Sequence, residues 1–475
     1  MLRLFASLAL AAAAAFPAPA DAIWSARYVV TMDGARRLIE RGAVAVRGGR
    51  ILAVGTRADI NAKYQPARRI DCADCLIAPG LVNAHAHAAM SLLRGIADDI
   101  RLQDWLEKFI FPVEAKAVSP DFVRWGTRLA AIEMALAGVT TYADMYYFED
   151  TVAEATKEIG LRGVLGETII GFPVADARTP AESLQFTERF IRRFRNDELI
   201  VPAVAPHAPY TNSDETLKSC RELANRYGVP LLTHLAETRH EVDQVRAKSG
   251  VSPVELLASL GVFNGRTVVA HAVWTDASDH AIFRKWNVGV AHCPSSNTKL
   301  ASGVAPVAAM LRAGVAVGLG TDGPAGSNND FNLFEEMDLA AKLQKVSTGD
   351  PTALPARTVF EMATIAGARA LGMEKEIGSL EPGKRADMIT VRLDAPHAVP
   401  LYNVYSQLVY ALKASDVSDV MVNGKLIVRG RRVLTFDTAL VTAKARQFGA
   451  KIRTLTGQAP PAASPEPSGT RNKGR

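Results

Sequence analysis

LIAPGLVNAHAHAAMSLLRG, residues 76–95, joins an apolar run punctuated by proline and glycine to a helical pattern. Two histidines, His85 and His87, stand at the end of the apolar run. Successive side chains of an extended strand point to opposite faces, so these two imidazoles point to the same face. A metal ion can use such a pair, but histidines in this spacing also occur as ordinary polar residues at a strand end. The choice between these interpretations depends on the other strands.

Seven more β-rich runs follow, and helical patterns separate them. The eight runs cover residues 76–87, 140–146, 163–169, 199–207, 230–237, 267–273, 288–294 and 315–322. The intervening segment SDETLKSCRELANRYG begins with a serine suited to a helix N-cap and ends in glycine. Eight strand–helix units predict an α/β fold, a (β/α)8 TIM-like barrel with parallel strands.

Polar residues with metal-binding chemistry stand at the C-terminal ends of these runs. Such ends converge on one mouth of a parallel barrel, where catalytic groups collect. The residues are His85 and His87 on the first run, His207 on the fourth, His234 on the fifth, His271 on the sixth and Asp322 on the eighth. Three imidazoles and one carboxylate suit Zn²⁺, with Fe²⁺ as an alternative. The group therefore favours a metal site, with a further coordination position for a water molecule whose pKa the ion lowers.

The flanks of the barrel have a different pattern, with short β-rich runs and glycine turns. We expect residues 23–75 and 379–435 to form one small β domain from both ends of the chain, around a barrel at 76–378. Residues 436–475 are expected to form a C-terminal helix and a disordered tail, because the last residues are rich in Pro, Ser and Gly without apolar periodicity.

Residues 1–22 resemble a secretory signal peptide, with Arg3, an apolar run and an A-x-A cleavage pattern that ends at Ala22. Cleavage there would leave a mature chain that begins at Ile23 in the periplasm or outside the cell. An N-terminal anchor or a wrongly chosen start codon is the alternative. No other segment approaches the roughly 18 apolar residues of a membrane helix, so no stable membrane anchor is expected.

The overall composition is that of a globular protein, with 475 residues, 48% of them hydrophobic and 22% charged. The net charge is +6, but basic and acidic residues alternate, and no basic run carries the interleaved aromatic residues of a nucleic-acid groove. A nucleic-acid partner is therefore not expected. Cys72 and Cys75 are close enough to form a disulfide in an oxidising compartment but could equally be free thiols.

Several long stretches make the chain similar to the amidohydrolase superfamily, and within it to the methylthioadenosine/S-adenosylhomocysteine deaminases, relatives of chlorohydrolases and of guanine and cytosine deaminases. These stretches include PGLVNAHAHAAMSLLRG, GVTTYADMYY, APHAPYT, THLAET, AHCPSSNTKLASGVAPV and GLGTDGPAGSNNDFNLFEEM. The resemblance covers about residues 25 to 430. It implies a small-molecule substrate and a hydrolase that acts on carbon–nitrogen bonds of cyclic amidines, and it is compatible with a homo-oligomer.

The resemblance also assigns roles to site residues. It implies four metal ligands: His85, His87, His234 and Asp322. His271 would lie beside the metal-bound water, and Glu237 would carry protons. Binuclear members have a carbamylated lysine at the end of the fourth strand, whereas this chain has His207 there, so one metal ion per chain is implied.

The implied reaction is hydrolytic deamination of an aminated purine nucleoside. Metal-bound water loses a proton to Asp322 or His271, the hydroxide attacks the amidine-like carbon, and Glu237 protonates the neighbouring ring nitrogen before ammonia leaves. Glu237 could instead be a solvated acid at a strand end.

The resemblance implies that Trp105, Glu114 and His207 contact the substrate, and that Glu237 contacts it as well. Trp105 also fits the apolar stripe of a helix, and Glu114 could be a surface acid. Family members carry arginines after the third strand to hold the substrate's tail, whereas GETIIGFPVADARTP offers only Arg178. The signal peptide is a second departure, because methylthioadenosine and S-adenosylhomocysteine arise in the cytoplasm.

Two other functions remain open. The first is a sister amidohydrolase that acts on a free base, a pterin or a triazine. The second is a periplasmic nucleoside-binding protein without catalysis, which the full set of expected ligands argues against.

Overall fold

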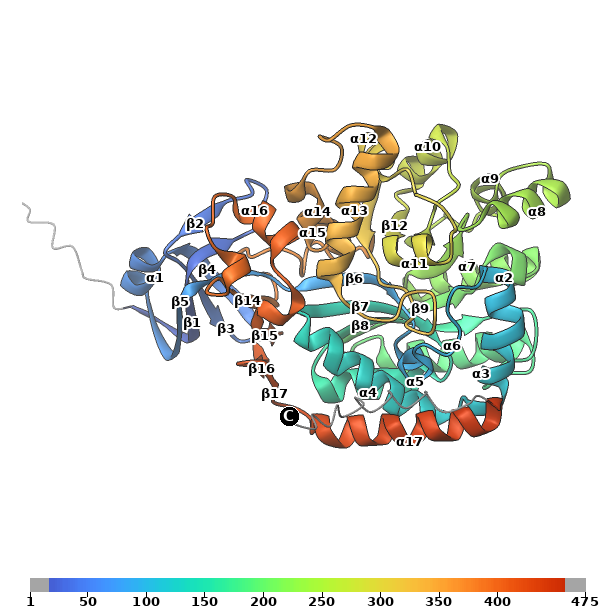
Figure 1. The fold of residues 1–475 in the computed structure, drawn as a ribbon, viewed down its shortest axis with the longest axis horizontal. Coiled ribbons are helices and arrows are strands. Elements are labelled where there is room, and N and C mark those ends of the chain that lie inside the picture. Colours follow the sequence, from blue (N-terminus) through green and yellow to red (C-terminus); the bar gives the residue numbers. More distant parts are fainter. Residues whose placement is uncertain (1–16, 458–475) are drawn as a thin grey trace, which may run out of the picture.

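The computed structural model describes residues 17–457. The described chain forms a closed eight-stranded barrel and a separate nine-stranded sheet, which lie side by side (Figure 1). The sheet takes its strands from both ends of the chain. The predicted parallel barrel and the predicted β unit from both chain ends are therefore confirmed.

All neighbouring strands of the barrel are parallel, and the last strand closes it by pairing with the first, Leu319 opposite Asn83. The barrel strands are β6 (Leu81–Ala86), β7 (Val139–Tyr146), β8 (Arg162–Ile169), β9 (Ile200–Pro206), β10 (Leu231–Leu235), β11 (Thr267–His271), β12 (Gly289–His292) and β13 (Ala316–Leu319). Six of the eight strands are fully contained in a predicted run, and β7 and β8 begin one residue before theirs, so periodicity located the barrel strands well.

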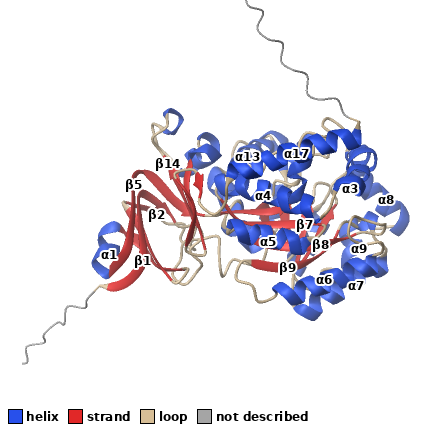
Figure 2. Cartoon of the chain, turned by 90° about the horizontal axis from the view of Figure 1, so that it is seen from below, coloured by secondary structure: helices blue, strands red, loops and turns tan. Residues whose placement is uncertain are grey.

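Helices surround the barrel, as Figure 2 shows for α4 to α7. In order these helices are α2 (Leu102–Asp104), the π-helical turn η2 (Trp105–Ile110), α3 (Phe111–Ala117), α4 (Pro120–Leu136), α5 (Glu149–Ile159), α6 (Pro180–Phe194), α7 (Asp214–Tyr227), α8 (Arg239–Ser249), α9 (Pro253–Ser259), α10 (Ala277–Trp286), α11 (Pro294–Lys299), α12 (Val307–Arg312), α13 (Leu333–Thr348), α14 (Ala356–Met362) and α15 (Ile365–Ala370). Ser213 caps α7 by accepting from the backbone of Thr216, as its sequence predicts.

The first predicted run, residues 76–87, is divided at Gly80, and this part of the prediction is wrong. Residues 76–79 end strand β5 (Tyr64–Pro79) of the separate sheet, whereas the barrel begins at Leu81. A Cβ atom at position 80 would lie 2.1 Å from the Thr140 hydroxyl oxygen, so only glycine fits where the chain passes from one sheet to the other. A continuous apolar run cannot reveal that its two halves belong to different sheets.

The separate sheet joins early and late segments of the chain. Its strands are β1 (Ala18–Val30), β2 (Leu38–Glu40), β3 (Gly42–Arg47), β4 (Arg50–Thr56), β5, β14 (Met388–Arg392), β15 (Val417–Val422), β16 (Lys425–Arg429) and β17 (Arg432–Val433). The helix α1 (Arg57–Lys63) follows β4. A buried ion pair between Arg162 and Asp387, 3.2 Å apart, ties the barrel to the segment that leads into β14.

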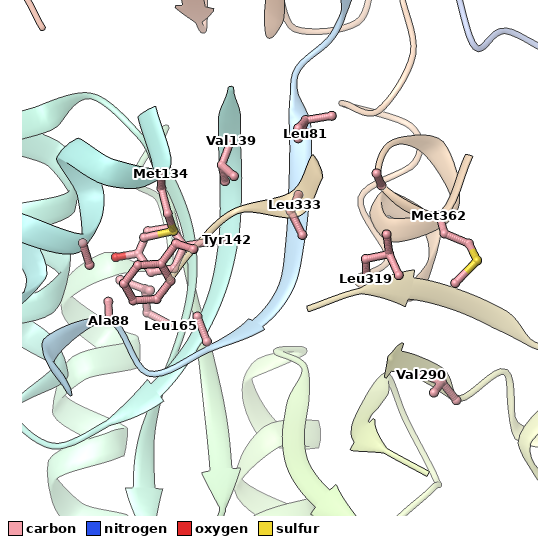
Figure 3. Close-up of a cluster of buried hydrophobic side chains, with 14 of the residues drawn as sticks. Leu81, Ala88, Met134, Val139, Tyr142, Leu165, Val290, Leu319, Leu333 and Met362 are labelled. Carbon is pink, nitrogen blue, oxygen red and sulfur yellow. The ribbon is translucent and has the colours of Figure 1, made fainter. Parts of the chain in front are cut away.

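The main core lies between the barrel strands and their helices. Figure 3 shows part of it, with Leu81 of β6, Val139 and Tyr142 of β7 and Met134 of α4. Helix α17 (Thr438–Thr456) packs along α4, and the Phe122 and Phe448 rings meet edge to face at 6.0 Å. The expected disordered tail beyond it lies outside the described residues. Among the described helices, none combines the length and the apolar character needed to cross a bilayer.

Candidate metal centre

Four side chains from three parts of the barrel meet at its mouth. His85 lies one residue before the end of strand β6, His87 directly follows the strand, His234 lies in β10, and Asp322 follows β13. One ligand atom from each of the four lies within 4.8 Å of the others. Three of the four side chains are buried, and His87 is mostly buried. The structure thus brings together the four residues that the sequence resemblance implies as ligands.

Backbone carbonyls fix the orientation of two of these rings. The His87 Nδ1–H donates to the Met145 carbonyl at 2.7 Å, and the His234 Nδ1–H donates to the His207 carbonyl at 2.8 Å. In the neutral form of each ring the Nε2 atom is then left with a lone pair, and the two Nε2 atoms face each other at 3.3 Å. Two lone pairs at this distance repel each other unless a proton or a cation lies between them, so the geometry fits a bound cation.

The remaining two ligands complete the same arrangement. The buried Nε2 of His85 forms no hydrogen bond within residues 17–457. The Asp322 Oδ1 atom lies 3.4 Å from it and 3.2 Å from the Nε2 of His87. A buried polar atom without a partner is costly, and a metal ion would remove that cost. Three imidazole nitrogens and one carboxylate oxygen are a ligand set that zinc accepts.

The protonation states of the ligands differ. Burial lowers the pKa of His85 to about 4, so that ring is neutral and ready to bind a metal near neutral pH. Burial also lowers the pKa of His87, but the hydrogen bond and charge of Asp322 outweigh it and raise that pKa to about 9. A metal ion must therefore displace a proton from His87, and metal binding should weaken as the pH falls.

Two residues that the sequence analysis did not single out hold the site in place. The Ser296 hydroxyl donates to Asp322 Oδ2 at 2.7 Å, and the His271 Nδ1–H donates to Asn297 Oδ1 at 2.9 Å. Both supporting residues lie in the first turn of helix α11, in the stretch CPSSNTK directly after β12. Polar residues directly after a barrel strand are the signal that could have indicated them.

The backbone at the site is strained. Asp322 has φ of +62° and His271 has φ of +71°, a left-handed conformation that residues other than glycine rarely adopt. Such strain persists where the surrounding structure holds it, and it is common at functional sites.

Glu237 lies beside this centre, two residues after the end of β10. It is buried, its Oε1 atom forms no hydrogen bond to any described residue, and its Oε2 atom lies 3.8 Å from the His271 Nε2 atom. Burial raises its pKa above the ordinary value. A buried carboxyl group with a raised pKa and one free oxygen is suited both to accept and to donate a proton. The structure therefore does not support the solvated-acid interpretation of Glu237.

Glu241 fixes the backbone that carries Glu237. Its two carboxylate oxygens accept from the backbone N–H groups of Ala236 and Glu237, each at 2.8 Å. Burial raises the pKa of Glu241 to about 7, although these two hydrogen bonds lower it. Ala236 has φ of +52°, so this turn is strained and depends on such support.

Glu241→Gln should lower kcat by about tenfold to a hundredfold, because an amide can accept only one of the two N–H groups and leaves the other unpaired at a typical cost of about 1–3 kcal/mol. Metal content should stay unchanged. Steady-state kinetics and elemental analysis measure both quantities. The matched control is Glu255→Gln, which removes a similar backbone acceptor at the start of α9, away from the site. Equal kcat in both variants would contradict the positioning role of Glu241.

A pocket opens directly onto the metal centre, and the residues expected to contact the substrate line it. Trp105, Glu114 and His207 all border this pocket together with the site residues. The Trp105 indole N–H donates to the Ala325 carbonyl at 2.9 Å, and the Tyr146 hydroxyl donates to Glu114 Oε1 at 2.7 Å. Glu114 is buried, so it is not the surface acid that the sequence left open.

Arg178, the arginine considered for the substrate's tail, does not line this pocket. It is exposed and its backbone N–H donates to Glu182 in the turn that begins α6. Cys72 and Cys75, whose state the sequence left open, are joined by a disulfide in the separate sheet.

Comparisons with known proteins agree with this geometry. Residues 76–427 match the family model described as amidohydrolase family, and residues 42–64 match an imidazolonepropionase-like composite domain of bacteria. The 5-methylthioadenosine/S-adenosylhomocysteine deaminase of Thermodesulfovibrio yellowstonii is 46% identical over 430 residues, which cover 90% of this chain and 98% of that protein. The enzyme of the same name from Syntrophobacter fumaroxidans is also 46% identical, over 91% of this chain and 99% of its own.

Solved structures are similar as well. An adenosine deaminase from Xanthomonas campestris with bound zinc has a TM-score of 0.90 and 42% identity, over 92% of this chain and 100% of that one. An atrazine chlorohydrolase from Arthrobacter aurescens, complexed with zinc, has a TM-score of 0.83 and 26% identity, over 90% of this chain and 100% of that one. Both relatives bind zinc on the fold that this chain adopts.

Proposed function

Because the chain belongs to the amidohydrolase family, we propose that it is a metal-dependent deaminase that releases ammonia from an aminated purine nucleoside. The observation that carries this proposal is the meeting of three histidines and one aspartate with Glu237 at the mouth of the barrel. The names of the relatives support a nucleoside substrate, either adenosine itself or an adenosine with a sulfur-containing extension.

One divalent ion would be held by the four converging side chains, with zinc as our first assignment and iron as the second. The zinc-bound relatives and the ligand set support zinc. His207 stands where a bridging lysine would be needed for a second ion, which supports a single ion. When bound, the ion supplies a Lewis acid that lowers the pKa of a water molecule toward neutrality.

The protein side chains then move the protons. Asp322 and His271 are placed to accept the proton that the attacking water loses. Glu237, with its raised pKa and its free Oε1 atom, donates a proton to the ring nitrogen beside the reacting carbon. The burial of these three groups excludes bulk water, which strengthens their electrostatic effect on the transition state.

The nucleoside's sugar would lie toward Glu114 and His207. Glu114 can accept hydrogen bonds from ribose hydroxyls, and Tyr146 holds its other side in place. Burial raises the pKa of Glu114 to about 7, although the Tyr146 hydroxyl lowers it. Trp105 forms an apolar wall for the base, and its hydrogen bond to Ala325 fixes the ring.

Ammonia release from a panel of substrates tests this proposal. The panel contains adenosine, methylthioadenosine, S-adenosylhomocysteine, guanine and a triazine, each offered to the zinc-loaded protein. We expect turnover of the adenosine nucleosides and little or none of guanine or the triazine. Turnover of guanine or the triazine alone would replace the proposal with a sister activity. Tight nucleoside binding without turnover would indicate a binding protein.

We also propose that residues 1–22 direct export and are removed after Ala22. The disulfide between Cys72 and Cys75 supports an oxidising compartment. Strand β1 begins at Ala18, so cleavage would require the strand to begin at Ile23 instead.

The prediction is a periplasmic protein whose intact mass corresponds to a chain that starts at Ile23. Mass spectrometry of protein from the periplasmic and cytoplasmic fractions measures this. A cytoplasmic protein that retains Met1 would contradict export.

A further inference from the structure

A second pocket lies next to the catalytic pocket and shares part of its wall. We call it the outer pocket; besides the shared residues it is lined by Gln103, Glu107, Gly171, Phe172, Thr211 and Gln244. The shared wall consists of Leu106, Phe111 and Tyr210, which line both pockets. A ligand too long for the catalytic pocket would therefore extend past these three residues into the outer pocket.

Aromatic rings line part of the outer pocket. The Phe111 ring at the start of α3 meets the Phe172 ring, from the loop after β8, edge to face at 5.1 Å. Phe172 is 37% exposed, which is unusual for so large an apolar side chain. A small apolar group placed against these rings would bury surface that is now in contact with water.

The described lining of the outer pocket offers no cation to an anionic group. This lining contains two carboxamides and one carboxylate, and it contains neither lysine nor arginine nor histidine. Arg178, which lies in the same loop as Phe172, is exposed and does not line the pocket. A carboxylate would have to leave water here without a cation to pair with, and Glu107 would repel it.

The sugar of the proposed substrate would lie on the side of the outer pocket. Glu114 is three residues after Phe111 on α3, and the His207 Nδ1 atom lies 3.1 Å from the Thr211 hydroxyl. Phe111 and Thr211 both line the outer pocket. Glu237 and His271, which act on the base, border the catalytic pocket but not the outer one. The 5′ end of the sugar, which points away from the reacting amine, would therefore enter the outer pocket.

We propose that the outer pocket is a specificity subsite that binds a neutral, apolar extension on the 5′ carbon of the nucleoside, and that it disfavours a charged one. This inference rests on the proposed function. It selects a thioether such as that of methylthioadenosine over the amino-acid tail of S-adenosylhomocysteine.

The wild-type test compares kcat/KM for three substrates that differ only at the 5′ end. Methylthioadenosine should exceed adenosine by about tenfold or more, since burial of one extra small apolar group typically changes specificity by about 10- to 200-fold. S-adenosylhomocysteine should fall below methylthioadenosine by at least about tenfold. Equal values for methylthioadenosine and S-adenosylhomocysteine would overturn the inference.

Phe172→Ala should lower the kcat/KM ratio of methylthioadenosine to adenosine by about fivefold to tenfold, because the apolar group loses part of its contact. The matched control is Tyr402→Ala, which removes an exposed aromatic ring from the segment after β14, where it lines neither pocket. The control should leave that ratio unchanged. An unchanged ratio in Phe172→Ala, or the same change in both variants, would overturn the inference.

Gln244→Arg tests the charge argument in the opposite direction. It places a cation in the outer pocket, from helix α8, without touching the catalytic pocket. The kcat/KM for S-adenosylhomocysteine should rise relative to that for methylthioadenosine by about tenfold, which is the effect of one charge-assisted contact. A fall in that ratio would overturn the inference.

Failure of the subsite and failure of the proposed function give different results. If adenosine is deaminated but the 5′ extensions do not follow this order, the subsite is wrong and the proposed function stands. If none of the three nucleosides is deaminated, the proposed function fails and the subsite fails with it.

Discussion

His234→Ala is expected to lose the metal ion and to lower turnover by at least about a thousandfold, since Lewis-acid activation of water contributes several kcal/mol to such reactions. His234 supplies one of four ligand atoms, and its Nδ1–H is already committed to the His207 carbonyl. Among the described residues this cluster has no fifth member. Elemental analysis of the purified variant measures the metal, and ammonia release measures turnover.

The variant should still fold, because the barrel core and not the ion supplies most of the buried apolar surface. Circular dichroism should therefore show a cooperative thermal transition. His280→Ala is the matched control, since His280 is a buried histidine on α10 outside the cluster. That control should keep its metal. A His234→Ala protein that retains stoichiometric metal would contradict the ligand assignment.

Glu237→Gln is expected to lower turnover by at least about a hundredfold with unchanged metal content. Glutamine keeps the shape and can still donate a hydrogen bond, but it cannot pass a proton to the ring nitrogen, a step that typically contributes about 10² to 10⁴-fold. Substrate affinity should change much less. Steady-state kinetics with adenosine, alongside elemental analysis, measure the three quantities.

Two results would contradict this role for Glu237. Near-normal turnover would leave His271 as the better candidate for the proton carrier. Loss of metal would mean that Glu237 supports or ligates the ion, although its Oε2 atom lies on the side of His271.

The sequence was sufficient to predict the barrel and the residues that meet at its mouth. Strand periodicity located the eight runs, and parallel closure then required their C-terminal ends to converge. His85, His234 and Asp322 stand at three such ends, so their meeting follows from topology rather than from loop conformation. The sheet that joins the two ends of the chain was also predictable, because the short flanking strands at either end are too few to form a buried core alone.

Features that depend on loops and exact register were not predictable in this way. Ser296 and Asn297 act through one hydrogen bond each, and their side-chain directions depend on how α11 begins. The division of residues 76–87 depends on a contact between Gly80 and Thr140, about sixty positions apart in the sequence. The position of Phe172 against Phe111 depends on a loop after β8 that has no periodic pattern.

Zinc titration of metal-free protein, with ammonia release from adenosine as the readout, tests the central claim most directly. We expect no measurable turnover without metal, a linear rise with added zinc up to one ion per chain, and no further gain beyond it. Inosine should appear in the same amount as ammonia. Full activity in the metal-free protein, or a rise that continues to two ions per chain, would contradict a single-ion deaminase built on His85, His87, His234 and Asp322.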